Sequence, residues 1–276
     1  MSTDLPLGKP TSYPLVYSPD LLVGIPRAQG RDSLDLASRL PFDGIDVWNA
    51  YELSWLNPRG KPVVAVAQLR IPASSPSIVE SKSLKLYLNS FNGARHESAA
   101  AVRDLIEEDL AHTVGVQVQV ELAPVSLGAN VEAPSIGAPE GECIDDEDTA
   151  IDTYRVDPGL LEGCTTSGTE VTETLHSHLL KSNCPITGQP DWATLLIRYR
   201  GAPIDRAALL RYIVSYRSHD DFHEHCVERI FVDLKRHCRP AALTVFARYT
   251  RRGGVDINPF RSDFETLRDC ERLWRQ

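Results

Sequence analysis

Apolar and polar positions alternate over several short segments of the chain, which is the pattern of half-buried β-strands. These segments are rich in β-branched and aromatic residues and are separated by Pro, Gly, Asn and Asp. We predict six strands from this pattern, three in each half of the chain. They cover residues 63–69, 84–91, 114–122, 193–199, 209–216 and 243–249.

Two other segments carry apolar residues at helical spacing. In the second half, such a stripe predicts a helix from about Asp220 to His237, facing a sheet. In the first half, a similar stripe predicts a helix from about Glu97 to Ala111. The stripes consist of Val227, Ile230, Phe231 and Leu234, and of Val102, Leu105, Ile106 and Leu110.

The two halves of the chain repeat each other. Residues 84–91 resemble residues 209–216, and residues 57–62 resemble residues 184–190. His96-Glu97 corresponds to His223-Glu224 further along. Because the matches fall in the same order, they indicate a duplicated strand-strand-helix-strand unit. This order predicts an α+β fold with antiparallel sheets and helices packed on one face.

Between the copies the composition shifts towards Pro, Gly, Ala and acidic residues, which is typical of a linker or a long surface loop. We therefore predict an N-terminal module over residues 1–122, an acidic linker over residues 123–157 and a C-terminal module over residues 158–276.

Composition restricts the class of protein. The net charge of −9 argues against a nucleic-acid-binding surface, so no nucleic acid is expected to bind directly. No apolar run reaches 18 residues and residues 1–14 lack the apolar core of a signal peptide, so we expect a cytoplasmic protein without a membrane partner. The six cysteines are scattered and are expected to be free thiols. A local excess of Lys and Arg after Lys235 suits a phosphate-bearing small ligand, or simply a solvated face.

Cys184 lies in a Pro- and Gly-containing loop that leads directly into a predicted strand, and Asp191 stands at the start of that strand. A thiol beside a carboxylic acid pairs a nucleophile with a proton donor. A loop cysteine without a chemical role and a turn-capping aspartate are the alternative.

Other candidate residues allow two interpretations each. Glu224, next to His223, could hydrogen-bond a purine from the start of its helix, or could only favour the helix terminus. Lys82, which follows Glu80-Ser81, could bind phosphate or protect a strand edge. Arg252-Gly253 suits a phosphate contact or a plain hairpin. No G-x-G-x-x-G follows a predicted strand, so a dinucleotide would bind without a Rossmann turn.

Together these motifs resemble the 7-cyano-7-deazaguanine (preQ0) reductases in their long, two-module form. The resemblance rests on three segments in the expected order and spans essentially the whole chain. The segments are Glu80-Ser81-Lys82-Ser83-Leu84-Lys85-Leu86-Tyr87, Asn183-Cys184-Pro185 with Thr187-Gly188-Gln189-Pro190-Asp191, and Asp221-Phe222-His223-Glu224.

The resemblance implies two tandem tunnelling-fold (T-fold) modules, assembly as a homodimer and a role in queuosine biosynthesis for tRNA. It implies that Cys184 attacks the nitrile carbon to form a thioimide, that Asp191 donates a proton, and that NADPH supplies two hydrides. It also implies substrate contacts and NADPH contacts, with no metal at the site. The substrate contacts are Val79, Glu80, Ser81, His223 and Glu224, and the NADPH contacts are Ser81, Lys82, Arg252 and Gly253.

Two other classes of function remain open from the residues themselves. The first is a zinc-dependent purine or pterin hydrolase of the same fold, with Cys184 and ligands drawn from His223, His225, Cys226 or Cys238. The second is a purine-binding or tRNA-binding module without catalysis, which the negative charge disfavours.

Overall fold

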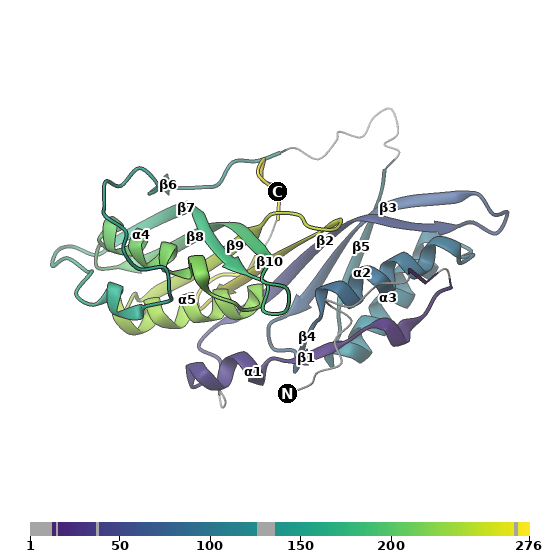
Figure 1. The fold of residues 1–276 in the computed structure, drawn as a ribbon, viewed down its shortest axis with the longest axis horizontal. Coiled ribbons are helices and arrows are strands. Elements are labelled where there is room, and N and C mark those ends of the chain that lie inside the picture. The colour runs from purple at the N-terminus through teal and green to yellow at the C-terminus, as the bar shows by residue number, and fades with distance from the viewer. Residues whose placement is uncertain (1–12, 15, 37–38, 126–135, 268–269) are drawn as a thin grey trace. The chain divides into compact units, whose positions relative to one another are not determined.

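The computed structural model describes residues 13–276 except residues 15, 37–38, 126–135 and 268–269 (Figure 1). The prediction that there is no signal peptide concerns residues 1–14, most of which lie outside the described residues. The chain forms two compact units. The first comprises Met1–Gln29, Asp46–Pro134 and Arg251–Ile257, and the second comprises Gly30–Ile45, Ser135–Thr250 and Asn258–Gln276. The predicted module boundaries, at residues 122 and 158, stay a prediction.

The first unit contains a sheet in the order β5-β3-β2, followed by the first residues of β10. Strands β3 and β5 run antiparallel, and β1 pairs with β4 in a separate two-stranded sheet. Helices α2 and α3 lie together beside the sheet (Figure 1). The bounds are β1 Gly24–Pro26, β2 Asp43–Leu56, β3 Pro62–Pro72, β4 Ser77–Val79, α2 Ser81–Ser90, α3 Ala99–Val114 and β5 Gln119–Pro124.

The second unit contains the sheet order β10-β9-β8-β7-β6, in which all pairs are antiparallel except β6 with β7. Helices α4 and α5 accompany this sheet as α2 and α3 accompany the first (Figure 1). The bounds are β6 Glu142–Cys143, β7 Val171–Asn183, β8 Pro190–Gly201, α4 Arg206–Ser215, α5 His223–His237, β9 Ala242–Tyr249 and β10 Val255–Ser262; a short helix α1 covers Ala28–Arg31.

The predicted α+β class with antiparallel sheets is confirmed, and so are both predicted apolar helix stripes. Val227, Ile230, Phe231 and Leu234 of α5 are fully buried. Val102, Ile106 and Leu110 of α3 are buried as well, and Leu105 packs at the edge of the same core. No helix within the described ranges is long and apolar enough to cross a membrane.

The prediction of strands over residues 84–91 and 209–216 is wrong, because these segments form helices α2 and α4. Leu84 and Tyr87 of α2 and Phe91, which follows the helix, are apolar residues with no exposed surface, and they follow the i, i+3, i+7 spacing of one helix face. The alternation of Leu84, Leu86 and Leu88 imitated a strand. The carboxylate of Glu80 caps α2 by accepting hydrogen bonds from the backbone N–H groups of Lys82 (2.8 Å) and Ser83 (2.7 Å).

The fourth helix repeats that arrangement. Leu209, Tyr212 and Tyr216 are fully buried at the same spacing, and the Asp205 side chain accepts a hydrogen bond from the Ala208 backbone N–H (2.8 Å). The repeated unit is therefore strand-strand-helix-helix-strand in both halves. The predicted linker contains the last two residues of β5 and the short strand β6, and its residues 126–135 lie outside the described chain.

A buried ionic network crosses the second unit. Arg31 donates two hydrogen bonds to the Glu228 carboxylate (2.8 and 2.7 Å), and Arg261 donates two more (3.0 and 2.9 Å). The side chains of Glu228 and Arg261 have no exposed surface. Removing one member of such a network leaves buried charge without compensation, which costs far more than an exposed ion pair contributes.

We expect Glu228→Gln to lower the free energy of unfolding by about 3–5 kcal/mol, because two guanidinium groups would lose their anion. Urea denaturation followed by circular dichroism measures the change. Asp104→Ala, which breaks an exposed pair with Arg103, is the control and should leave the midpoint unchanged. Equal effects of the two substitutions would show that the network does not stabilise the unit.

Candidate active site

Cys184 is the first residue of the connection between β7 and β8. Its backbone N–H donates a hydrogen bond to the Gln189 carbonyl (2.9 Å), and its carbonyl accepts one from the Gly188 N–H (2.9 Å). Gly188 has φ of +66°, a left-handed conformation that suits glycine. The loop is thus closed on Cys184 itself, so the thiol is held in a fixed place and is only 7% exposed.

Strand pairing brings Cys184 and Asp191 to the same face of the hairpin. Ser182 of β7 pairs directly with Asp191 of β8, so their side chains lie on the same side of the sheet. Cys184 follows Ser182 by two positions and still pairs with Gln189, so the alternation of a strand places it on that side too. Ala193, two positions beyond Asp191, is fully buried, which identifies this side as the interior of the unit.

A second segment lies along the end of β7 and fixes the start of α5. The Asn183 backbone N–H donates to the His219 carbonyl (2.8 Å), and the Asp221 N–H donates to the Asn183 carbonyl (3.1 Å). The Asn183 side-chain amide also donates to the Asp220 carboxylate (2.9 Å). Helix α5 begins at His223, two residues after Asp221. The short parallel bridge therefore places His223 near the end of the hairpin that contains Cys184.

His223 and Asp191 then approach each other. His223 Nε2 lies 3.9 Å from Asp191 Oδ1, and the His223 ring packs edge-on against Tyr249 with ring centroids 3.9 Å apart. Asp191 and Glu224 are buried, with 6% and 1% of their surface exposed. The structure therefore gathers a thiol, a carboxyl group, an imidazole and a second carboxyl group from the predicted motifs at one end of the second unit's sheet.

Asp221 lies between two histidines just before the start of α5. Burial alone would raise the pKa of Asp221, but the nearby imidazole of His219 (3.5 Å) and the contact with His225 hold that pKa below its ordinary value. Its carboxylate lies 3.0 Å from His225 Nδ1. Gly30 makes room for that imidazole, since a Cβ at Gly30 would come within 2.4 Å of the His225 ring. These contacts fix the first turn of α5.

Cys226 also lies on this turn, but its environment is unlike that of Cys184. Cys226 has no exposed surface, and burial raises the pKa of its thiol well above the ordinary value, with the negative charge of Asp221 adding to the shift. Burial likewise raises the pKa of the neighbouring Tyr249. A protonated, enclosed thiol is a poor nucleophile. Tyr249 was missed by the sequence analysis, since only its place at the end of a predicted strand marked it.

The predicted substrate strand lies in the first unit. Val79 ends β4 and is buried, and Glu80 and Ser81 begin α2. Glu80 is 1% exposed and its carboxylate caps the helix, a structural role that the sequence analysis did not anticipate. Its predicted contact with a purine stays a prediction, as do those of Val79 and Ser81.

The predicted NADPH contacts all belong to the first unit, on two separate segments. Arg252 and Val255 close a tight turn in which Gly253 and Gly254 have φ of +60° and +75°, as a two-residue hairpin turn requires. A Cβ at Gly253 would lie 3.4 Å from the side chain of Lys85, so this turn lies beside the first turns of α2, which carry Ser81 and Lys82. The turn that carries Arg252 and Gly253 therefore lies near the helix that carries Ser81 and Lys82, and the contact of these four residues with NADPH stays a prediction.

The ligand set of the predicted zinc hydrolase is not gathered. Cys226 and Cys238 are twelve residues apart along α5 and its end, roughly 18 Å at 1.5 Å per residue. Cys238 instead contacts Cys164, with sulfur atoms 3.3 Å apart. Among the described residues, the group of three or more ligand side chains close enough for a metal ion is Cys143, His176 and His178, which contains none of the predicted ligands.

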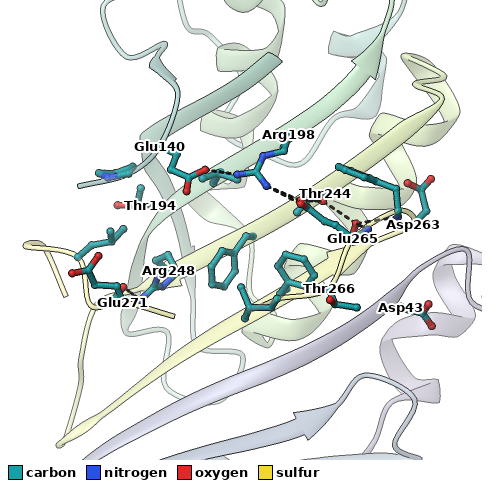
Figure 2. Close-up of a pocket in the computed structure, with 18 of the residues that line it drawn as sticks. Asp43, Glu140, Thr194, Arg198, Thr244, Arg248, Asp263, Glu265, Thr266 and Glu271 are labelled. Atoms are coloured by element: carbon teal, nitrogen blue, oxygen red, sulfur yellow. Dashed lines mark hydrogen bonds and ion pairs between the residues drawn. The ribbon is translucent and has the colours of Figure 1, made fainter. Parts of the chain in front are cut away.

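A separate cavity of about 920 Å³ lies on the opposite side of the second unit's sheet (Figure 2). It is lined by Thr194, Leu196 and Arg198 of β8, which alternate with the buried residues of that strand. The guanidinium of Arg198 is paired with the carboxylates of Glu265 (2.8 Å) and Glu140 (Figure 2). The predicted catalytic residues do not line this cavity.

Two segments of the chain match models of known protein families. Residues 13–122 match the family model described as "Nitrile reductase, 7-cyano-7-deazaguanine-reductase N-term", and residues 190–266 match the one described as "QueF-like protein". Asp191, His223 and Glu224 lie within the second match, and Cys184 lies six residues before it. An archaeosine synthase, solved in the apo form, is 18% identical over 37% of this chain and all of its own, with a TM-score of 0.32, which is too low to define the fold.

Full-length relatives give the family. The chain is 60% identical to the NADPH-dependent 7-cyano-7-deazaguanine reductase of Azoarcus sp., over 97% of this chain and 94% of that protein. It is 58% identical to the protein of the same name from Bordetella pertussis, over 96% and 95% of the two chains. The chain belongs to the family of NADPH-dependent 7-cyano-7-deazaguanine reductases.

We expect the thiols to differ in reactivity as their surroundings differ. In the folded protein, treated with a chelator and kept at pH 8, iodoacetamide should alkylate Cys226 at least roughly tenfold more slowly than the exposed Cys143, because Cys226 is enclosed and protonated. Peptide mass spectrometry after timed quenching measures both rates, and a sample unfolded in urea is the control in which the rates converge. Similar native rates would show that the first turn of α5 is open.

Proposed function

We propose that this chain reduces the nitrile of 7-cyano-7-deazaguanine (preQ0) to the aminomethyl group of 7-aminomethyl-7-deazaguanine (preQ1) in queuosine biosynthesis. The observation that supports the proposal is the 60% identity to a reductase of that name, together with Asp191 lying 3.9 Å from His223 on the hairpin that Cys184 ends. Reduction consumes two hydrides and two protons per nitrile, so the protein must bind NADPH twice in each turnover.

Cys184 is the nucleophile in this proposal. Its thiolate adds to the nitrile carbon while the nitrile nitrogen takes a proton, giving a thioimide bound to Cys184 Sγ. A nitrile is a poor hydride acceptor, and the thioimide is a better one, because its C=N nitrogen can be protonated. The loop geometry supports this role, since both backbone hydrogen bonds at Cys184 hold the thiol in place before substrate arrives.

Asp191 is the proton donor to the nitrile nitrogen. It lies on the same side of the hairpin as Cys184, and His223 at 3.9 Å can return a proton to it during the second reduction. After the first hydride reaches carbon, expulsion of the Cys184 thiolate leaves an imine. Protonation of the imine nitrogen and the second hydride then give the amine.

Buried polar groups recognise the base. A deazaguanine presents N–H and NH₂ donors on one edge, and Glu224 offers a buried carboxylate acceptor at the start of α5. His223, Val79, Glu80 and Ser81 complete the proposed set of substrate contacts. A buried acceptor that is satisfied only by the correct base discriminates strongly against bases that lack the donor.

NADPH, when bound, supplies the hydrides. Ser81, Lys82, Arg252 and Gly253 are the proposed contacts, supported by the proximity of the glycine turn to α2. Gly254 allows a close approach of the turn, because a Cβ there would come within 2.4 Å of the Glu52 carboxylate. The guanidinium of Arg251 stacks 4.7 Å from the ring of Tyr51, which stiffens the turn.

The proposal extends to the assembly and its setting. We assign the two repeated strand-strand-helix-helix-strand units to tandem T-fold modules, associated further as a homodimer. A cytoplasmic location suits the chemistry, because the cytosol supplies NADPH and keeps a nucleophilic thiol reduced. The net charge of −9 favours a small-molecule substrate over direct nucleic-acid binding.

We expect Cys184→Ala to abolish the covalent adduct. Wild-type protein mixed with preQ0 without NADPH should gain the mass of one substrate per chain, and turnover with NADPH should fall at least about 1000-fold in the variant. Intact-protein mass spectrometry and NADPH oxidation measure the two effects. Cys270→Ala is the matched control and should keep both the adduct and the rate. An undiminished rate in Cys184→Ala would exclude covalent catalysis by this thiol.

We expect Asp191→Asn to slow turnover by about 100-fold or more, because the amide has nearly the same shape but cannot donate the required proton. Binding of preQ0 should change little, so the loss should appear in kcat. Stopped-flow absorbance of adduct formation measures the step, and exposed Asp152→Asn serves as the control. If Asp191→Asn forms the adduct and product at the wild-type rate, another group donates the proton.

A further inference from the structure

Three metal-ligating side chains gather away from the proposed catalytic residues. The Sγ of Cys143 and one ring nitrogen each of His176 and His178 all lie within 4.8 Å of one another. His176 pairs across the sheet with Leu196, which lines the cavity on the side opposite Asp191 and Ala193. Neither the family motifs nor the proposed reaction uses these residues.

The backbone holds the three ligands in register. Cys143 of β6 pairs with His176 of β7, and the Ile144 N–H donates to the His176 carbonyl (3.0 Å). Gly141 permits this close approach, since a Cβ there would come within 2.1 Å of the Thr174 carbonyl oxygen. His178 lies at a bulge of β7 between Ser177 and Leu180, and its ring centroid is 5.3 Å from that of His176.

Outer contacts orient both imidazoles. His176 Nδ1 lies 3.0 Å from the Glu140 carbonyl oxygen, which can only accept a hydrogen bond. In the neutral ring the proton is therefore on Nδ1, and the Nε2 lone pair is left for a metal. His178 Nδ1 contacts the Thr194 hydroxyl (2.9 Å). A second ring nitrogen bonded to a carbonyl or hydroxyl is the usual surrounding of a metal-bound histidine.

A carboxylate fixes the backbone between the two histidines. Asp145 accepts a hydrogen bond from the Ser177 hydroxyl (2.6 Å) and another from the His178 backbone N–H (2.9 Å). Its negative charge lies beside the cluster, which favours a cation. Asp145 thus acts as an orienting group, while Cys143, His176 and His178 offer the ligand atoms.

We propose that Cys143, His176 and His178 form a zinc-binding site that fastens the short strand β6 to β7. One thiolate and two imidazoles match the ligands of Zn²⁺, with water in the fourth position. A tetrahedral zinc site needs ligand atoms roughly 3.3–3.6 Å apart, so the side chains close in slightly when the ion binds. Cys143 is exposed, so the ion has a path of entry from solvent.

The ion would act on folding and not on the reduction of the nitrile. Strand β6 has only two residues, and its pairing with β7 is too short to be stable alone. A metal that binds only the paired form stabilises that form by mass action. Binding requires the Cys143 thiol to lose its proton, so affinity for zinc should increase with pH.

The test uses the full chain, freed of metal with a chelator and then titrated. Zn²⁺ measured by calorimetry should bind with one tight site per chain, and Co²⁺ should give the near-ultraviolet charge-transfer band of a cobalt–thiolate bond. We expect Cys143→Ser to abolish the band and weaken zinc binding at least about 100-fold, and His178→Gln to weaken it as well. Zinc should raise the thermal midpoint of the wild type and leave that of Cys143→Ser unchanged.

Cys184→Ala is the matched control and should keep both the cobalt band and the zinc affinity. The adduct of Cys184 with preQ0 tests the proposed function, and metal binding tests the zinc site. The two measurements are independent, so either proposal can fail while the other holds. Equal zinc affinity in the wild type and Cys143→Ser would overturn the site. Loss of the metal in Cys184→Ala with its retention in Cys143→Ser would place the ion at the catalytic thiol and overturn it equally.

Discussion

The backbone bridge between Asn183 and residues 219–221 is the contact on which the candidate site of the second unit depends. It joins the end of a hairpin to the start of a helix that begins about forty residues later in the chain, and both of its hydrogen bonds involve main-chain atoms. Backbone hydrogen bonds therefore position Cys184 and His223 relative to each other. In the proposed reaction, a thiol and an acid placed in this way would need little reorganisation when substrate binds.

Duplication explains why the site residues are distributed unequally. Both halves build the same strand-strand-helix-helix-strand unit, with Glu80 and Asp205 capping the equivalent helices α2 and α4. The first unit presents a basic glycine turn beside α2, and the second presents Cys184 in the equivalent of the Asn57 loop. Each copy has therefore kept the fold, while only the second carries a cysteine at this position.

The sequence predicted the repeat, two helix stripes and the chemical motifs, because each depends on local spacing. It failed for α2, where alternating leucines at 84, 86 and 88 concealed the helical spacing of Leu84, Tyr87 and Phe91. It also missed β2, β7 and β10, which carry buried polar residues. Asp46 is paired with Arg27 at 2.5 Å, and the Asn49 side-chain amide donates a hydrogen bond to Asp256 (2.8 Å). A sequence pattern assigns such polar residues to the surface, because it does not show the distant partners that allow them to be buried.

The approach of His223 to Asp191 could not be predicted either, since the parallel bridge that creates it has no pattern in the sequence. The most direct test of the central claim is a crystal structure of the protein soaked with preQ0 in the absence of NADPH. The account predicts continuous density from Cys184 Sγ to the former nitrile carbon, with Asp191 within hydrogen-bond distance of the nitrogen. Unmodified Cys184, with the nitrile bound elsewhere or joined to another thiol, would contradict it.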